Sequence, residues 1–208
     1  MLKNVKDIVE RSHNRASFFE VIESIYPKLD WRYKLIERAY NDAKDAFRQV
    51  SREGGGRYFE HLRATTLLLI LYLRVRDYKL IIVAILHDVV EDIPSWTIER
   101  IRDTYGEEIA LLVDYMTKPK KPGQSAGEVD RIYHARFQQA PRNFFLIKLC
   151  DRLHNILTLS GCPLSKRLNK IEETRRYYLS YAEANQILIH ELEEALSEVN
   201  LSEELSHQ

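Results

Sequence analysis

At residues 80–92 the chain reads Leu-Ile-Ile-Val-Ala-Ile-Leu-His-Asp-Val-Val-Glu-Asp, an apolar run that ends in a histidine and three carboxylates. Helical spacing places His87 above Glu91 and Asp88 above Asp92. Unpaired charges at the edge of a core cost free energy. The pattern therefore favours a functional site in which a potential metal ligand lies one helical turn from a potential catalytic acid or base. A helix end exposed to solvent, with carboxylates near the start of the next helix, explains the same residues without any catalytic or metal-binding role.

Apolar residues elsewhere recur with a period near 3.6, which indicates helices almost throughout. Glycine and proline number only 7 and 6 in 208 residues, so long helices are favoured over a turn-rich β-sandwich. The patterns predict helices over residues 31–50, 58–75, 78–91, 107–117, 142–159 and 166–199. We therefore expect an all-α fold of eight to ten helices. One domain would span 1–208, with a core at about 30–185, accessory helices in 1–28 and an acidic C-terminal helix to about 200.

Charge and cysteine content narrow the class of protein. Lys plus Arg and Asp plus Glu are 31 each, and this zero net charge argues against a DNA or RNA partner. Two cysteines are too few for a disulfide framework and fit a cytoplasmic protein. The longest apolar run, residues 64–73, is half of the roughly 20 residues that a membrane helix needs, so no membrane partner is expected. An apolar stripe in the tail can pack on the core or on another copy, which leaves a homo-oligomer open.

Two further segments carry polar residues in apolar surroundings. Asp151 lies inside the apolar segment 147–155 and shares a helix face with Asn155. An ion pair with Lys148 or Arg152 explains this aspartate without a ligand role. A histidine also follows the triple glycine at 54–56. Together, two histidines and two aspartates on three apolar helices can converge on one divalent cation, and these are His61, His87, Asp88 and Asp151. Imidazole with carboxylate suits Mn²⁺, Fe²⁺ or Zn²⁺ better than Ca²⁺.

These motifs resemble those of the HD-domain metal-dependent phosphohydrolases of the RelA/SpoT type. The candidate ligands match the family's H…HD…D pattern, residues 87–92 resemble its HDxxED motif, and residues 148–155 resemble KLADRLHN with Cys150 in place of alanine. Arg52, Gly55 and Tyr58 match the stretch R-x-x-G-x-x-Y-x-x-H that ends in His61. Thr117-Lys118 and Glu173-Thr174 with Tyr178 resemble two later motifs. The resemblance covers roughly residues 31–182 and is nearest to a stand-alone small alarmone hydrolase.

The resemblance implies an all-α bundle around one Mn²⁺ and removal of the 3′-pyrophosphate from ppGpp or pppGpp, which leaves GDP or GTP. It implies that the metal ligands are His61, His87, Asp88 and Asp151. Glu91 and Asp92 would position and deprotonate the attacking water. The nucleotide pocket would be lined by Arg52, Lys148, Asn155 and Tyr178.

The sequence departs from the family pattern near the substrate. Glu53 stands where the family commonly has a basic residue, and Arg57 and Leu62 replace prolines. None of these changes touches the candidate ligands. Two other functions therefore stay open: the same fold acting on a different phosphorylated nucleotide or cofactor, and a non-catalytic module that binds alarmone or a partner.

Overall fold

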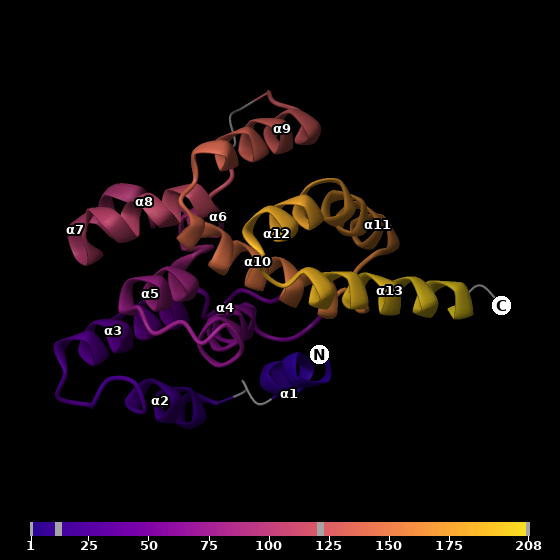
Figure 1. Cartoon of the computed structure of the whole chain (residues 1–208). Coiled ribbons are helices and arrows are strands. Elements are labelled where there is room, and N and C mark those ends of the chain that lie inside the picture. The colour runs from indigo at the N-terminus through magenta and orange to yellow at the C-terminus, as the bar shows by residue number, and fades with distance from the viewer. Residues whose placement is uncertain (1, 11–13, 120–122, 207–208) are drawn as a thin grey trace.

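The computed structural model describes residues 2–10, 14–119 and 123–206, and every extended regular element in these ranges is a helix, which confirms the all-α fold (Figure 1). The first part contains α1 (Leu2–Glu10), α2 (Arg15–Glu23), α3 (Trp31–Ala46), α4 (Tyr58–Leu67), α5 (Tyr78–Leu86), α6 (Val89–Asp92), α7 (Ile98–Tyr105) and α8 (Glu107–Met116). The second part contains α9 (Ala126–Arg136), α10 (Arg142–Leu157), α11 (Leu164–Glu173), α12 (Leu179–Asn185) and α13 (Ile189–Ser206).

Helices α4, α5 and α10 lie at the centre, and the other helices pack around them (Figure 1). Helix α5 is apolar on all sides, and its residues 80–86 are all buried, as expected for a helix enclosed by others. The buried apolar side chains form one continuous cluster that draws on every helix from α1 to α13. The polar residues at the ends and inner faces of the central helices are therefore held by a packed core.

The chain is divided more finely than the eight to ten helices expected. The predicted helix 78–91 is two helices, because the backbone of Asp88 (φ −104°, ψ −4°) lies between α5 and α6. The predicted helix 58–75 passes from α4 into a π-helical turn, η2 (Leu68–Tyr72), in which the amide of Leu73 donates to the carbonyl of Leu68.

The predicted long helix 166–199 is also interrupted, which corrects the sequence expectation. A second π-helical turn, η4 (Thr174–Tyr178), joins α11 to α12. Gln186 and Leu188 then adopt left-handed backbone conformations, with φ values of 57° and 55°, and separate α12 from α13. Apolar periodicity alone does not reveal such breaks, because the buried stripe continues on both sides of them.

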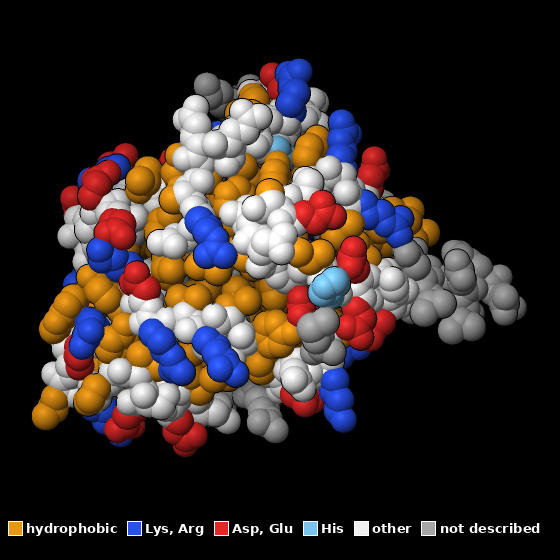
Figure 2. Space-filling model, viewed as in Figure 1, with side chains coloured by type: hydrophobic (Ala, Val, Ile, Leu, Met, Phe, Trp, Pro, Cys, Tyr) orange, Lys and Arg blue, Asp and Glu red, His pale blue; other side chains and the backbone are white. Residues whose placement is uncertain are grey.

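The surface mixes charges of both signs. On the face shown in Figure 2, Lys and Arg side chains lie among Asp and Glu side chains, and apolar side chains show between them. In the described ranges, no helix has both the length and the apolar character that a membrane crossing requires.

Candidate active site

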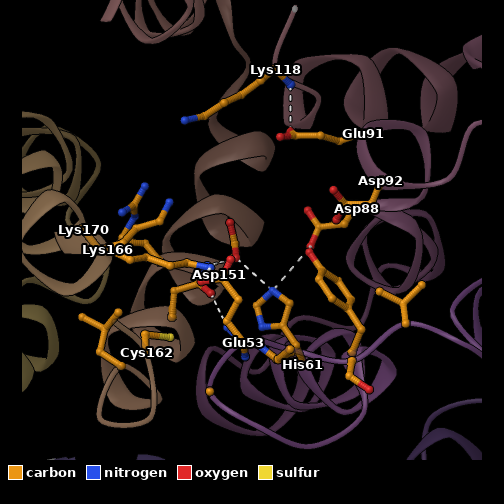
Figure 3. Close-up of a pocket in the computed structure, with 18 of the residues that line it drawn as sticks. Glu53, His61, Asp88, Glu91, Asp92, Lys118, Asp151, Cys162, Lys166 and Lys170 are labelled. Carbon is orange, nitrogen blue, oxygen red and sulfur yellow. Dashed lines mark hydrogen bonds and ion pairs between the residues drawn. The ribbon is translucent and has the colours of Figure 1, made fainter. Parts of the chain in front are cut away.

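Three central helices bring the four predicted metal ligands together. His61 comes from α4, His87 and Asp88 from the junction of α5 and α6, and Asp151 from α10. Ligand atoms of His61, His87 and Asp88 all lie within 4.8 Å of one another. Asp151 Oδ1 lies 3.1 Å from His61 Nε2 and 3.7 Å from His87 Nε2. Figure 3 shows His61 between the carboxylates of Asp151 and Asp88.

Neighbouring groups fix which nitrogen of each imidazole faces the carboxylates. His87 Nδ1 lies 2.9 Å from the backbone carbonyl of Ala84, to which it donates. His154 Nδ1 accepts from Arg52 Nη1 at 3.2 Å, because a guanidinium only donates. His61 Nδ1, 2.8 Å from the same nitrogen, is then the donor of that pair. Both imidazoles therefore turn Nε2 toward the carboxylates. Groups that hydrogen-bond the other ring nitrogen usually orient metal-binding histidines in this way.

The two aspartates are held in their charged form. Burial raises the pKa of Asp88, but His87 and His61 outweigh burial and bring that pKa below its usual range. The hydroxyl of Tyr58 also donates to Asp88 Oδ2 at 2.8 Å. Burial likewise raises the pKa of Asp151, and Lys148 and the two imidazoles hold it well below the ordinary value. Charged carboxylates are the form that coordinates metals.

This donor set fits a divalent cation. The ligand nitrogens of His61 and His87 are 3.3 Å apart, and both side chains are buried. Each imidazole lies within 3.7 Å of both carboxylates of the set. Two imidazole nitrogens, which bind a metal in their neutral form, together with two carboxylate oxygens suit a borderline first-row metal.

The two predicted acid/base residues, Glu91 and Asp92, lie in α6, directly after His87 and Asp88. The amide of Asp92 donates to the carbonyl of Asp88 at 3.0 Å, so the predicted i, i+4 relation between these residues is present. The carboxylate of Glu91 accepts from the backbone amide of Lys118 at 3.0 Å (Figure 3). Both carboxylates line the same cavity as three of the candidate ligands.

That cavity has a volume of about 440 Å³. His87 is fully buried behind it, and the other candidate ligands line it. Its basic lining residues are Arg52, Lys118, Lys148, Arg152, Lys166 and Lys170. Figure 3 shows Lys166 and Lys170 on the wall opposite Asp88 and Asp92. A cavity with cations on one wall and a candidate metal site on the other suits a phosphorylated ligand.

Three of the four predicted substrate residues line the cavity. Arg52 donates to Asn155 Oδ1 at 2.7 Å, and Asn155 in turn donates to Asp151 Oδ1 at 2.6 Å. Lys148 donates to the other oxygen of Asp151 at 3.0 Å. These residues therefore join the candidate metal site to the cavity wall.

The fourth predicted substrate residue, Tyr178, lies elsewhere. Its side chain is fully buried and is not part of the cavity lining. The guanidinium of Arg152 lies over its ring, 3.7 Å from the centroid. Arg152 lines the cavity, and the ring of Tyr178 packs behind it.

Sequence reasoning did not select four residues that the structure brings to the site: His154, Arg152, Lys118 and Lys170. Arg152 and His154 lie in the quoted segment 147–155, and the signal was their position one and three residues after Asp151 in a buried helix. Lys118 belongs to the matched Thr117-Lys118 motif, but no role was assigned to it, and Lys170 carries no local signal.

The turn between α3 and α4 forms one edge of the cavity. The amide of Arg52 donates to the carbonyl of Gly56, and Gly55 and Gly56 have φ values of 93° and 80°, which favour glycine. Glu53, which departs from the family pattern, is exposed and forms an ion pair of 2.9 Å with Lys166 of α11.

The comparisons with known proteins agree with this geometry. A family model described as "HD domain" matches residues 39–187. The chain belongs to the HD-domain family. The matched residues include all four candidate ligands of this HD domain.

Similar curated proteins are of the RelA/SpoT type, which confirms the resemblance. A protein named "GTP pyrophosphokinase rsh" from Brucella melitensis is 33% identical over 79% of this chain and 22% of its own length. The "Bifunctional (p)ppGpp synthase/hydrolase SpoT" of Escherichia coli is 30% identical over 88% of this chain and 26% of its own length. The HD-domain chain thus spans about a quarter or less of these relatives.

A solved structure shares the fold. It is described by the words "A metazoan ortholog of SpoT hydrolyzes ppGpp and plays a role in starvation responses". The match has a TM-score of 0.71 at 22% sequence identity, and it covers 80% of this chain and 96% of that one. The arrangement of helices around the HD residues is therefore that of this structure.

Proposed function

We propose that this HD domain is a Mn²⁺-dependent hydrolase that removes the 3′-pyrophosphate from ppGpp or pppGpp, yielding GDP or GTP and pyrophosphate. One observation carries the proposal: three candidate metal ligands, together with Glu91 and Asp92, line one cavity whose opposite wall carries lysines. Proteins with a (p)ppGpp synthase/hydrolase name are among the relatives, and this supports a guanosine polyphosphate as substrate. We place the reaction in the cytoplasm and in one domain formed by the whole chain.

Four residues would hold the metal: His61, His87, Asp88 and Asp151. When bound, the cation would supply Lewis-acid polarisation of a phosphoryl oxygen and a lowered pKa for water. Lys148 and Asn155 orient Asp151 by donating to its two carboxylate oxygens. His154 and the carbonyl of Ala84 orient the imidazoles.

The chain's own carboxylates would handle the proton of the attacking water. The water oxygen forms a bond to the phosphorus attached to the 3′ oxygen, and the bond between that phosphorus and the 3′ oxygen breaks. Glu91 or Asp92 accepts the proton of the water, and the 3′ oxygen takes up a proton to become a hydroxyl. The pyrophosphate that leaves is anionic, and the basic wall would stabilise it.

Incubation of the metal-loaded protein with a panel of nucleotides tests this function. The panel contains ppGpp, pppGpp, nucleotides with a single 3′- or 2′-phosphate, and deoxynucleoside triphosphates. We expect ppGpp and pppGpp to give pyrophosphate without orthophosphate. Turnover of another member in preference would favour the same fold acting on a different nucleotide. Binding of ppGpp without any turnover would favour a non-catalytic module.

A further inference from the structure

His134 of α9 is a buried histidine that the proposed reaction does not use. Its side chain is 4% exposed, and its ring stacks on Tyr177 of η4, with 3.9 Å between the ring centroids and 12° between the ring planes. The hydroxyl of Tyr181 on α12 lies 3.2 Å from its Nδ1. Its Nε2 lies 3.4 Å from Oε1 of Glu173, the last residue of α11. The imidazole is thus held between a hydroxyl and a carboxylate.

The two atoms that face each other across this contact are both buried and polar. In the described parts of the chain, neither His134 Nε2 nor Glu173 Oε1 makes a hydrogen bond. A buried polar atom without a hydrogen bond costs free energy. An imidazole with its proton on Nε2 removes this cost for both atoms, through a hydrogen bond only slightly shorter than the observed distance. The other nitrogen, Nδ1, is then the acceptor for the hydroxyl of Tyr181.

Glu173 connects this contact to the wall of the active-site cavity. Its second oxygen, Oε2, accepts from Arg152 Nη2 at 2.9 Å. The guanidinium of Arg152 also lies over the ring of Tyr178, 3.7 Å from the centroid. Arg152 lines the cavity together with the candidate metal ligand Asp151. One carboxylate therefore joins a buried histidine behind the cavity to a guanidinium that lines it.

Other cations compete for the carboxylate of Glu173. Lys118 Nζ lies 3.6 Å from Oε1, and Lys170 Nζ lies 3.5 Å from Oε2. The last torsion of a glutamate side chain is broad, so the carboxylate can turn toward either ammonium and leave Arg152 without its partner. A hydrogen bond from His134 to Oε1 opposes this rotation and keeps Oε2 on Arg152.

We propose that His134 is a positioning residue, whose Nε2–H donates to Glu173 and thereby holds the guanidinium of Arg152 at the wall of the active site. This inference rests on the proposed function, because the effect on Arg152 is read through turnover of ppGpp. The π-helical turn η4 supports both ends of the connection, since Tyr177 stacks on the imidazole and Tyr178 lies beneath the guanidinium.

Two substitutions of His134 separate the role of the nitrogen from that of the ring. His134→Phe keeps an aromatic ring on Tyr177 but removes the donor, and His134→Gln places an amide donor near the position of Nε2. We expect KM for ppGpp to rise about tenfold in His134→Phe, because small displacements of positioning groups are costly, while kcat and bound metal stay close to the wild type. His134→Gln should restore most of the affinity. An unchanged KM in His134→Phe would overturn the proposal.

His190 of α13 provides a matched control. Its Nδ1 lies 3.4 Å from the carboxylate of Glu193, the same distance as in the buried pair, but its side chain is 71% exposed. His190→Phe should leave KM within about twofold of the wild type, because exposed pairs of this kind contribute little. A rise in KM as large as that of His134→Phe would show that the loss of any histidine has this effect, which would contradict a specific role for His134.

Nitrogen NMR of the histidine and arginine side chains tests the contacts without catalysis. In mildly alkaline buffer the wild-type His134 should carry its proton on Nε2, and this measurement needs no variant to fold. The Nε–H signal of Arg152 should shift in His134→Phe, return toward the wild-type position in His134→Gln, and stay unchanged in His190→Phe. A proton on Nδ1 instead of Nε2, or an unmoved Arg152 signal in His134→Phe, would overturn the proposal.

The two kinds of measurement fail independently. If no nucleotide is turned over, the proposed function fails, and the NMR signals still decide whether His134 positions Arg152. If ppGpp is hydrolysed but the signal of Arg152 does not respond to His134→Phe, the proposed function stands and the positioning role is wrong.

Discussion

The backbone amide of Lys118 donates a hydrogen bond of 3.0 Å to the carboxylate of Glu91, which lies 27 residues earlier in the chain (Figure 3). Lys118 lies just beyond the end of α8, and its own ammonium is anchored to Asp130 of α9. The carboxylate of Glu91 is thus held by the segment that follows α8. A fixed carboxylate beside the HD residues is suited to orient a water.

Glu91→Gln should separate metal binding from chemistry. The amide oxygen of glutamine can still accept from Lys118, so the fold and the metal content should be retained. Without the carboxylate, kcat should fall by roughly 10²- to 10⁴-fold, the usual contribution of a positioned acid or base, while KM changes little. Glu99→Gln, on the exposed start of α7, serves as the control. Loss of metal from Glu91→Gln would make Glu91 a ligand instead.

Glu173→Gln should destabilise the fold, because it leaves Arg152 buried without its charged partner. The side chain of Arg152 is only 3% exposed and that of Glu173 11%. Breaking such a pair should lower the free energy of unfolding by about 3 kcal/mol, measured by urea denaturation. Glu172→Gln, at an exposed neighbouring position, should cost less than about 0.5 kcal/mol. Similar losses for both variants would refute the role assigned to Glu173.

The stability difference between wild type and Glu173→Gln should depend on pH. Burial raises the pKa of Glu173, but His134, Arg152 and the two lysines hold it below the ordinary value of 4.5. The charged form therefore stabilises the fold fully above pH 4.5, and this contribution is lost as the pH falls further below that value. Urea denaturation at several pH values should show the difference shrinking in acid. A difference that grows in acid would have the wrong sign.

Gly161→Ala should disturb the cavity edge without touching the metal. A Cβ atom at this position would lie 2.5 Å from the carbonyl oxygen of Gly54, so the turn that carries Arg52 must move. We expect KM to rise about tenfold or more, because small displacements of positioning residues are costly. Gly127→Ala meets no atom within 4 Å and should behave like the wild type. An unchanged KM for Gly161→Ala would show that the turn does not position the substrate.

The pH profile of kcat/KM should report Lys170, since this ratio reflects the free enzyme. With a pKa of about 8, Lys170 is charged below that pH and loses its charge above it, so kcat/KM should decline above pH 8. Burial lowers this pKa most, Arg152 and Lys118 lower it further, and Glu173 and Asp151 raise it. Lys170→Arg stays charged and should lack this decline. An identical decline in both proteins would assign it to another group.

The convergence of the candidate metal ligands was predictable from sequence because these residues lie in short motifs within apolar helices. His87 and Asp88 end the apolar run of α5, and Asp151 lies inside α10, so each polar residue stood out locally. The break between α5 and α6 at Asp88 was not predictable, because apolar residues continue into α6. That break also turns Glu91 toward Lys118, a contact that no local pattern indicates.

Tyr178 shows where motif matching reaches its limit. Its motif position suggested a substrate contact, but the π-helical turn η4 places the ring in the core beneath Arg152. Lys118, just after α8, and Lys170 of α11 lie far apart in the chain, so only the tertiary structure brings them together. The substitution of a basic residue by Glu53 is likewise understood only through its ion pair with Lys166.

Release of pyrophosphate from ppGpp, measured with Mn²⁺ and again after chelation, tests the central claim most directly. The wild type should release one pyrophosphate per GDP with Mn²⁺, should stop after chelation, and should recover when Mn²⁺ is returned. His87→Ala and Asp151→Ala should lose both bound metal and activity, because each removes a ligand. Full pyrophosphate release by a verified metal-free sample, or by His87→Ala, would contradict the account.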